Sequence, residues 1–321
     1  MAMHLWAVAE AAATKKHVDA RSEAVGYAAG LAGWLLAGSV FVAVKMVSDE
    51  MPPWLMCFFR SVISAVALLP IAASHRHEIM AFLRERWLEA WIIGIIGLGL
   101  TQGVMFTALG YTSAVNAGIV FALAPMITLV AAHFVLREDM TGWQGVGSAI
   151  AFVGVVVISV QGSMARLLAF QFGVGDLIAL GSAFLFAGYT VLLKRAKFKL
   201  PPIPLLVILL IAGSSGSLPF ALWEVWKGEH SNLALNGYLA LFYCGIIGGS
   251  LLYLLYNWSV EVLGASRAGT LVYTQPLFVA LFAWLILGEA IEWYHYVGAA
   301  LVAVGVLFVT LLRPRPLPHA A

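Results

Sequence analysis

Long, uninterrupted apolar runs dominate the chain, and short polar segments separate them. A helix of about 20 apolar residues crosses the hydrocarbon core of a bilayer, which is about 30 Å thick. Because the runs are continuous rather than alternating, they predict helices and exclude a β-barrel. Ten spans are predicted, at Gly26–Val47, Trp54–Ala73, Ala90–Leu109, Ala114–Leu136, Trp143–Val160, Leu177–Leu193, Ile203–Trp226, Leu239–Val260, Gly269–Leu287 and Trp293–Leu312.

The composition agrees with an all-α membrane protein. Apolar residues make up 62% of the 321 positions and charged residues only 11%, whereas soluble domains average about 45–50% and about 25%. A soluble enzyme of ordinary composition is therefore excluded. The net charge of +2 gives no reason to expect nucleic acid as a partner. Cys57 and Cys244 lie inside apolar runs without ligand-spaced neighbours, so we expect packing roles, no metal site and no cofactor.

The distribution of basic residues predicts the orientation in the membrane. If the N-terminus is cytosolic, the internal segments hold 14 of the 18 Lys and Arg residues and the external segments hold 2. This excess follows the positive-inside rule, so both termini are expected in the cytosol. Residues 1–24 form the predicted N-terminal tail, without the apolar core of a cleaved signal, and residues 313–321 form the C-terminal tail.

The two halves of the chain resemble each other. A shift of 151 positions places Gly94–Val160 on Gly245–Leu311 without a gap, with 18 identities in 67 positions, where chance gives roughly 10%. The matched pairs include Pro125 with Pro276, Glu138 with Glu289, Gly147 with Gly298, and Gly154 with Gly305. We predict two five-helix repeats, at 25–160 and 174–312. Equivalent residues are separated by five crossings, so the repeats are inverted, as is typical of secondary transporters.

Two stretches carry a family resemblance. They are Leu109–Glu138, "LGYTSAVNAGIVFALAPMITLVAAHFVLRE", and Leu263–Glu289, "LGASRAGTLVYTQPLFVALFAWLILGE". Both resemble the bacterial EamA-domain branch of the drug/metabolite transporter superfamily. The resemblance implies ten helices in two inverted EamA repeats, a bacterial inner-membrane location and substrate movement through a central cavity.

These observations favour a secondary carrier of small metabolites over other classes. Amino acids or related compounds and export are the favoured expectation, and an uptake carrier for a vitamin or nucleoside-like cofactor is the alternative. An intramembrane enzyme is disfavoured because HExxH and GxSxG are absent. A channel would be expected to show an ion-selective polar ring, which is not evident. No GxxxxGK[ST] loop occurs, so a gradient or an exchange substrate is expected to drive transport.

Polar and aromatic residues at membrane depth are the substrate-binding candidates, because a polar group in hydrocarbon requires a partner or water. Gln102 is the repeat equivalent of Tyr253, and Tyr253 and Asn257 share one helical face. For each candidate, a helix-to-helix hydrogen bond or a lipid-facing position is the alternative. The candidates are Trp34, Arg60, Gln102, Asn116, Tyr189, Tyr253, Asn257, Tyr273 and Gln275.

Arg60 and Lys45 are the basic residues inside predicted spans. Either side chain would attract a carboxylate or phosphate on a substrate. The alternatives are that Lys45 extends to the nearby interface and that Arg60 pairs with backbone, Asp49 or Glu50.

Pro125 and Pro276 each remove a mid-helix hydrogen bond and are hinge candidates, with inherited packing kinks as the alternative. His133 lies one turn before Glu138 and is the proton-coupling candidate. In the alternative interpretation, Glu138 and Glu289 only end their helices and fix the tight connections that follow.

Overall fold

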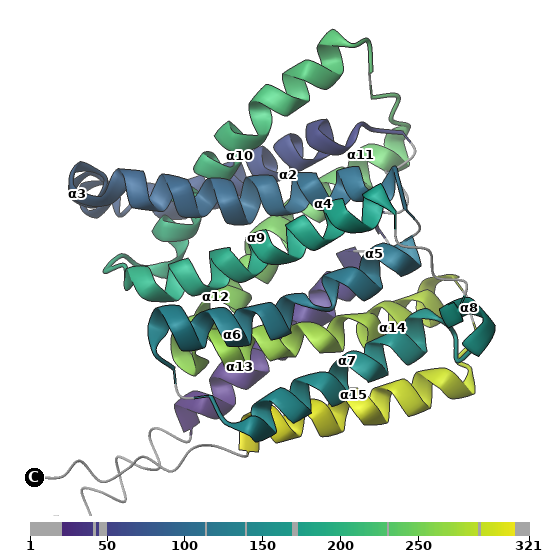
Figure 1. The fold of residues 1–321 in the computed structure, drawn as a ribbon. Helices are drawn as coiled ribbons and strands as arrows, with labels where there is room; N and C mark the ends of the chain where they lie inside the picture. Colours follow the sequence, from purple (N-terminus) through teal and green to yellow (C-terminus); the bar gives the residue numbers. More distant parts are fainter. Residues whose placement is uncertain are drawn as a thin grey trace, which may run out of the picture.

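The computed structural model describes residues 21–40, 43–44, 50–112, 114–138, 140–168, 173–229, 231–287 and 290–311. Every regular element in these residues is a helix. The helices form one bundle, with α2 and α10 at the top of the view and α7 and α15 at the bottom (Figure 1). The chain is thus an all-α protein, as the apolar runs predict.

Nine helices of the described part are long and apolar enough to cross a membrane. Residues 21–40, which cover most of the first predicted span, are helical but are not among the nine. This N-terminal helix packs against α12 near Leu252 and against α14 near Phe278. Lys45 lies outside the described residues.

The helices of the first half follow the predicted spans closely, with one exception. α2 (Pro53–Ala73) begins with proline at its first position, where the missing amide proton costs no hydrogen bond. After the third helix come α5 (Ala114–Phe121), α6 (Ala124–Leu136) and α7 (Gly142–Ser159). At the start of α7, Thr141 and Gln144 form a capping box.

The exception is the third helix, which begins at Arg76 and not at the predicted Ala90. It continues through α3 (Arg76–Gly94), η1 (Ile95–Leu100, a π-helix) and α4 (Thr101–Leu109). The backbone is non-helical at Arg86, which divides α3 at a kink. Apolar length alone missed the first part because its sequence is polar, and its Phe82 is buried against Phe198 of a distant connection.

The second half repeats this pattern. The short α8 (Met164–Leu168) precedes it, and α9 (Val174–Ala196) and α10 (Pro202–Trp226) are single helices. The next helix runs through α11 (Leu235–Tyr243), η2 (Cys244–Leu251, also a π-helix) and α12 (Leu252–Leu263). The chain then forms α13 (Ala265–Thr270), η3 (Leu271–Thr274, a 3-10 helix), α14 (Gln275–Leu287) and α15 (Trp293–Leu311).

Glycines bring α7 and α15 into backbone contact, and the two helices lie side by side (Figure 1). A Cβ on Gly147 would lie 2.7 Å from the carbonyl oxygen of Gly305, and one on Gly154 would lie 2.8 Å from that of Gly298. Real side chains do not approach so closely, so these positions require glycine. The crossing order, 147 with 305 and 154 with 298, makes the pair antiparallel.

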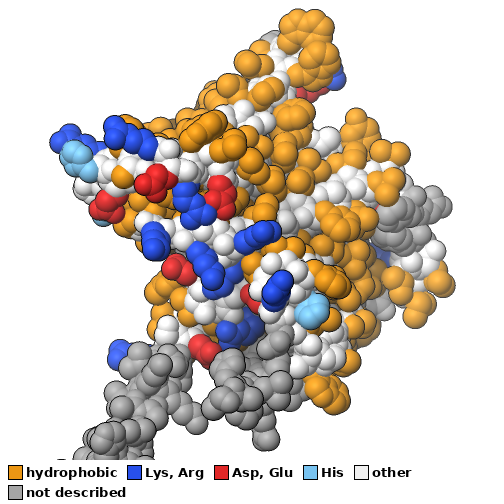
Figure 2. Space-filling view, turned by 60° about the vertical axis from the view of Figure 1, so that its left-hand side comes forward, with side chains coloured by type: hydrophobic (Ala, Val, Ile, Leu, Met, Phe, Trp, Pro, Cys, Tyr) orange, Lys and Arg blue, Asp and Glu red, His pale blue; other side chains and the backbone are white. Residues whose placement is uncertain are grey.

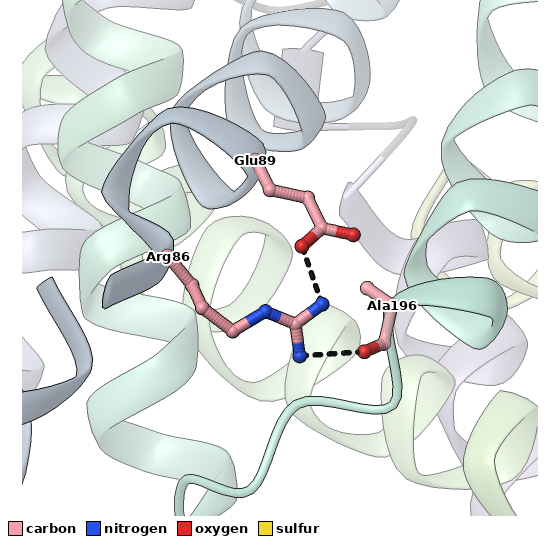
Figure 3. A network of polar contacts seen from close by, with 3 residues as sticks. All are labelled: Arg86, Glu89 and Ala196. Atoms are coloured by element: carbon pink, nitrogen blue, oxygen red, sulfur yellow. Dashed lines mark hydrogen bonds and ion pairs between the residues drawn. The ribbon is translucent and has the colours of Figure 1, made fainter.

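Arg86 holds the kinked part of α3 to the end of α9 (Figure 3). Its Nη1 donates to the carbonyl oxygen of Ala196 at 2.9 Å, and its Nη2 forms an ion pair with Glu89. Its guanidinium also lies 4.9 Å from the ring centre of Phe198. The connection between α9 and α10 is therefore anchored to α3.

Charged side chains gather at one end of the bundle, and hydrophobic side chains cover its flanks (Figure 2). This end carries the connections that follow α2 and α9, where exposed basic residues are concentrated. They include Arg76, Arg84, Arg195, Lys197 and Lys199. The apolar flanks are those expected of a protein surrounded by lipid.

Candidate functional site

Five of the predicted substrate-binding residues lie together inside the bundle. Gln102 Nε2 donates to the hydroxyl of Tyr253 at 3.0 Å, and the hydroxyl of Tyr189 donates to Asn257 Oδ1 at 2.6 Å. The rings of Tyr189 and Tyr253 meet edge to face at 6.2 Å between centroids. The guanidinium carbon of Arg60 lies 5.9 Å from the centroid of the Tyr253 ring. We call Arg60, Gln102, Tyr189, Tyr253 and Asn257 the central polar cluster.

Four helices supply the cluster, two from each half of the sequence. Arg60 lies on α2 and Gln102 on α4, while Tyr189 lies on α9 and Tyr253 and Asn257 on α12. α2 contacts η2, and α4 contacts α9. The cluster therefore occupies the interface between the two halves.

Both π-helices end just before a cluster residue. η1 ends at Leu100, two residues before Gln102, and η2 ends at Leu251, two residues before Tyr253. Thr101 Oγ1 donates to the carbonyl oxygen of Ile96 at 2.7 Å, which satisfies one acceptor of the widened turn. Within η1, Gly97 leaves the space that the ring of Tyr189 fills. Such π-segments occur frequently at functional sites.

An aromatic group adjoins the cluster. Trp34, on the N-terminal helix, meets Tyr256 and Phe186 edge to face, with ring centroids 5.5 Å and 6.1 Å away. The hydroxyls of Tyr256 and Thr190 lie 2.9 Å apart. The indole nitrogen of Trp34 is buried without a hydrogen-bond partner among the described residues. Trp34 thus packs in an aromatic group with Phe186 and Tyr256, and its role as a substrate-binding residue stays a prediction.

A cleft of about 360 Å³ reaches the cluster from the end of the bundle where α9 joins α10. It lies between these helices and α12. Asn257 lines it, so the hydrogen bond to Tyr189 lies at the boundary between the cleft and the buried cluster. Its other lining residues include Lys194, Leu205, Leu254, Trp258 and Glu261.

Three other predicted residues lie elsewhere. Asn116 on α5 and Gln275 on α14 are half-buried, and neither takes part in the two hydrogen bonds of the cluster. Tyr273 is buried in a separate apolar group with Ala122 of the α5–α6 break and Val302 of α15. The helical spacing of Tyr273 is interrupted because it lies in the 3-10 segment η3.

Pro125 and Pro276 lie at equivalent places, where one helical element passes into the next within a single spanning segment. α5 ends at Phe121, and Pro125 lies in the first turn of α6. In the second half, η3 precedes Pro276, which lies in the first turn of α14. Each proline thus lies in the first turn of its helical element, where proline is best tolerated.

His133 is exposed near the end of α6, and its Nδ1 lies 2.9 Å from the backbone carbonyl oxygen of Glu138. The Glu138 carboxylate turns away, toward the first turn of α13. It accepts from the amide of Ala265 at 3.2 Å, and from the amide and hydroxyl of Ser266 at 3.4 and 2.6 Å. Glu138 therefore joins the first half to the second, a long-range contact that a single sequence does not reveal. Glu289 lies outside the described residues.

Sequence analysis also overlooked Glu224. This buried carboxylate on α10 accepts from the backbone amides of Trp54 and Leu55, at 3.1 and 2.9 Å. It caps α2 from another helix, and the ring of Trp54 stacks on Phe220 beside it. An acidic residue inside the apolar run "LWEVW" was the signal available in the sequence. In the described residues, no group of three or more His, Cys, Asp and Glu could hold a metal ion.

The described residues form a helical bundle with nine helices of membrane-spanning length and a buried polar cluster, which is the architecture of a multi-pass membrane protein. The profile of the EamA-like transporter family matches residues 24–160 and 173–311. The chain belongs to this family.

Relatives agree with this membership. The chain is 25% identical over 273 residues to the uncharacterized transporter YyaM of Bacillus subtilis, covering 85% of this chain and 89% of the relative. It is 23% identical to the uncharacterized inner membrane transporter YhbE of Escherichia coli, covering 84% and 86%. An uncharacterized transporter of Archaeoglobus fulgidus is 30% identical, covering 72% and 81%. One crystal structure shares the fold, with a TM-score of 0.73, 22% identity, and coverage of 91% of this chain and 97% of that one.

Proposed function

We propose that the protein is a secondary carrier that moves a small polar or amphipathic metabolite across the bacterial inner membrane by alternating access. Amino acids and related compounds are the favoured substrates, and export is the favoured direction. The proposal includes ten spanning helices in two inverted repeats, at 25–160 and 174–312, with both tails in the cytosol. Proton coupling through His133 or exchange would supply the driving force, and no enzymatic step is involved.

The observation that carries the proposal is the direct contact between Gln102 and Tyr253. These residues are equivalent under the 151-residue shift, and two equivalent residues can touch each other only on the axis that relates the halves. A polar pair on this axis, inside the bundle, is where a carrier with inverted repeats binds its substrate.

The contact between α7 and α15 supports the same symmetry. Gly147 meets Gly305 and Gly154 meets Gly298, so exchanging the two halves returns the same set of contacts. An antiparallel pair of this kind supports an axis in the membrane plane, as inverted repeats require. The matched π-helices before Gln102 and Tyr253 follow the same relation.

A counterflow assay tests the proposal. Purified protein in liposomes preloaded with one unlabelled compound is offered the same compound with a label, in turn for amino acids, nucleobases, vitamins and sugar phosphates. We expect saturable accumulation of one class, strongly reduced by Gln102→Ala and Asn257→Ala. Tyr238→Phe is the matched control, because Tyr238 is exposed on α11. Folded protein that accumulates no compound of any class would contradict the carrier function.

A further inference from the structure

Arg60 is a cation buried inside the bundle without a matching anion. Arg60 is only 4% exposed, and its Nε has no hydrogen-bond partner among the described residues. Two ion pairs occur in the described part of the chain, Arg86 with Glu89 and Arg267 with Glu23. Neither involves Arg60. A charge at this depth costs free energy unless another group compensates it.

The acidic residues Glu50 and Glu224 of the described part of the chain are engaged elsewhere. Glu50, which the sequence offered as a partner, accepts from the backbone amide of Ala234. Glu224 directs its carboxylate oxygens to the amides at the start of α2. Asp49 lies outside the described residues. The other alternative was pairing of the Arg60 side chain with backbone, and within the described residues its Nε donates to no backbone carbonyl.

The surroundings of Arg60 are polar but electrically neutral. The face of Tyr253 lies 5.9 Å from the guanidinium carbon, and the Tyr253 hydroxyl, which accepts from Gln102, also interacts with the Arg60 side chain. An aromatic face compensates only part of the cost of burying a cation. The neighbouring hydroxyl of Ser61 is also buried without a hydrogen-bond partner among the described residues. Arg60 Nε is thus a buried donor without an acceptor in the described part of the chain, and it remains available for an acceptor from outside the chain.

We propose that Arg60 binds the anionic group of the transported molecule, so that the substrate is an organic anion or zwitterion bearing a carboxylate or a phosphate. The inference rests on the carrier function proposed above. A guanidinium offers a planar pair of donors that matches either group. Tyr253, one turn from Asn257, then links the anion site to the residue that lines the cleft.

The unused charge also predicts a distinctive stability. A residue retained only for folding should stabilise the fold, whereas a buried charge that awaits a ligand should not. Arg60→Gln is therefore expected to keep or raise the melting temperature of the ligand-free protein. In the same variant, exchange of the substrate should fall by at least about tenfold, the loss that corresponds to one charge-assisted hydrogen bond. Arg60→Lys keeps the positive charge but loses the planar pair of donors, so its exchange rate should lie between those of the wild type and Arg60→Gln.

The decisive experiment uses matched pairs of compounds that differ in the anionic group. Liposomes containing the full chain are tested by counterflow with phenylalanine and phenylalaninamide, nicotinate and nicotinamide, lactate and lactamide, and glycerol 3-phosphate and glycerol. We expect only the acidic member of a pair to be exchanged. The identity of the acid that is exchanged shows whether the site takes a carboxylate or a phosphate. The exposed Arg84→Gln on α3 serves as the control and should exchange like the wild type.

Each result is decisive. Exchange of the member without the acidic group as fast as its acid, or unchanged exchange of the acid by Arg60→Gln, would overturn the anion site while leaving the carrier function intact. A marked drop in the melting temperature of Arg60→Gln would assign Arg60 a structural role and overturn the proposal. If the wild type exchanges nothing in the broader screen either, the carrier function itself fails, and the anion site fails with it.

Discussion

Gln102 donates a hydrogen bond of 3.0 Å to Tyr253, its own counterpart 151 positions later in the chain. The same position of the repeat holds an amide side chain in the first half and a phenol in the second, and the two side chains are in direct contact. The bond is asymmetric, because one partner donates and the other accepts. At this contact the two halves therefore carry different side chains at positions that match in the sequence.

We predict that this bond contributes modestly to stability and strongly to transport. Hydrogen bonds between membrane helices average about 0.6 kcal/mol, with a maximum of about 1.7 kcal/mol. A double-mutant cycle with Gln102→Leu and Tyr253→Phe, read by reversible unfolding in detergent, should give a coupling energy in this range. Counterflow of the identified substrate should fall in both single variants. Coupling near zero would show that the two side chains act independently.

The contact between α7 and α15 predicts a matched pair of glycine variants. Gly154→Leu places a large side chain against the backbone of Gly298 and should destabilise the fold by about 1–3 kcal/mol or more. Gly145→Leu on the same helix is the control, because a Cβ there meets nothing within 4 Å. Thermal unfolding should separate the variants by several degrees. Equal melting temperatures would contradict this packing.

The Glu138 carboxylate predicts a stability effect that spans the two halves. Glu138→Ala leaves the first amides of α13 without their acceptor and should cost about 1–3 kcal/mol. Glu138→Gln keeps one acceptor oxygen and should cost less. Substitution of the exposed Glu85 by alanine is the control. It should change the free energy of unfolding by no more than about 0.5 kcal/mol. If Glu138 only ended its own helix, Glu138→Ala would behave like this control.

The predicted orientation can be tested with single-cysteine reporters. Cys57 and Cys244 are buried with 0% exposure, so the unmodified protein should react little with a membrane-impermeant maleimide. Glu229→Cys, in the connection after α10, should be labelled on intact cells. Lys199→Cys, in the connection before α10, should be labelled only after the membrane is opened. The reverse result would place both termini outside.

Much of the fold could be predicted because apolar length and repeat matching depend only on the sequence. The bounds of α2, α7 and α15 fall within a few residues of their predicted spans. The early start of α3 was missed, since its polar first half is held by the contact between Phe82 and Phe198. The sequence contains no local sign of such a contact.

Part of the candidate site could be predicted because the repeat and the regular helix geometry relate its residues to one another. Gln102 and Tyr253 follow from the repeat, and Asn257 follows from Tyr253 because α12 is a regular helix. Tyr273 lies apart from the cluster, in a 3-10 segment that turns about 120° per residue and not about 100°. A helical wheel drawn with a single period loses its phase across such a segment. Glu138 and Glu224 accept hydrogen bonds from backbone amides of other helices. A helical wheel, which describes one helix, does not represent such contacts.

The paired π-helices also carry historical information. A π-turn holds a surplus residue relative to the α-helix around it, and η1 corresponds to the Ile246–Leu251 part of η2 under the same 151-residue shift. Independent insertions at the same site in two halves would be a coincidence. If the halves descend from one five-helix ancestor, that ancestor already contained the surplus residue before its gene was doubled. The irregular turn would then be older than the two-fold architecture in which it now lies.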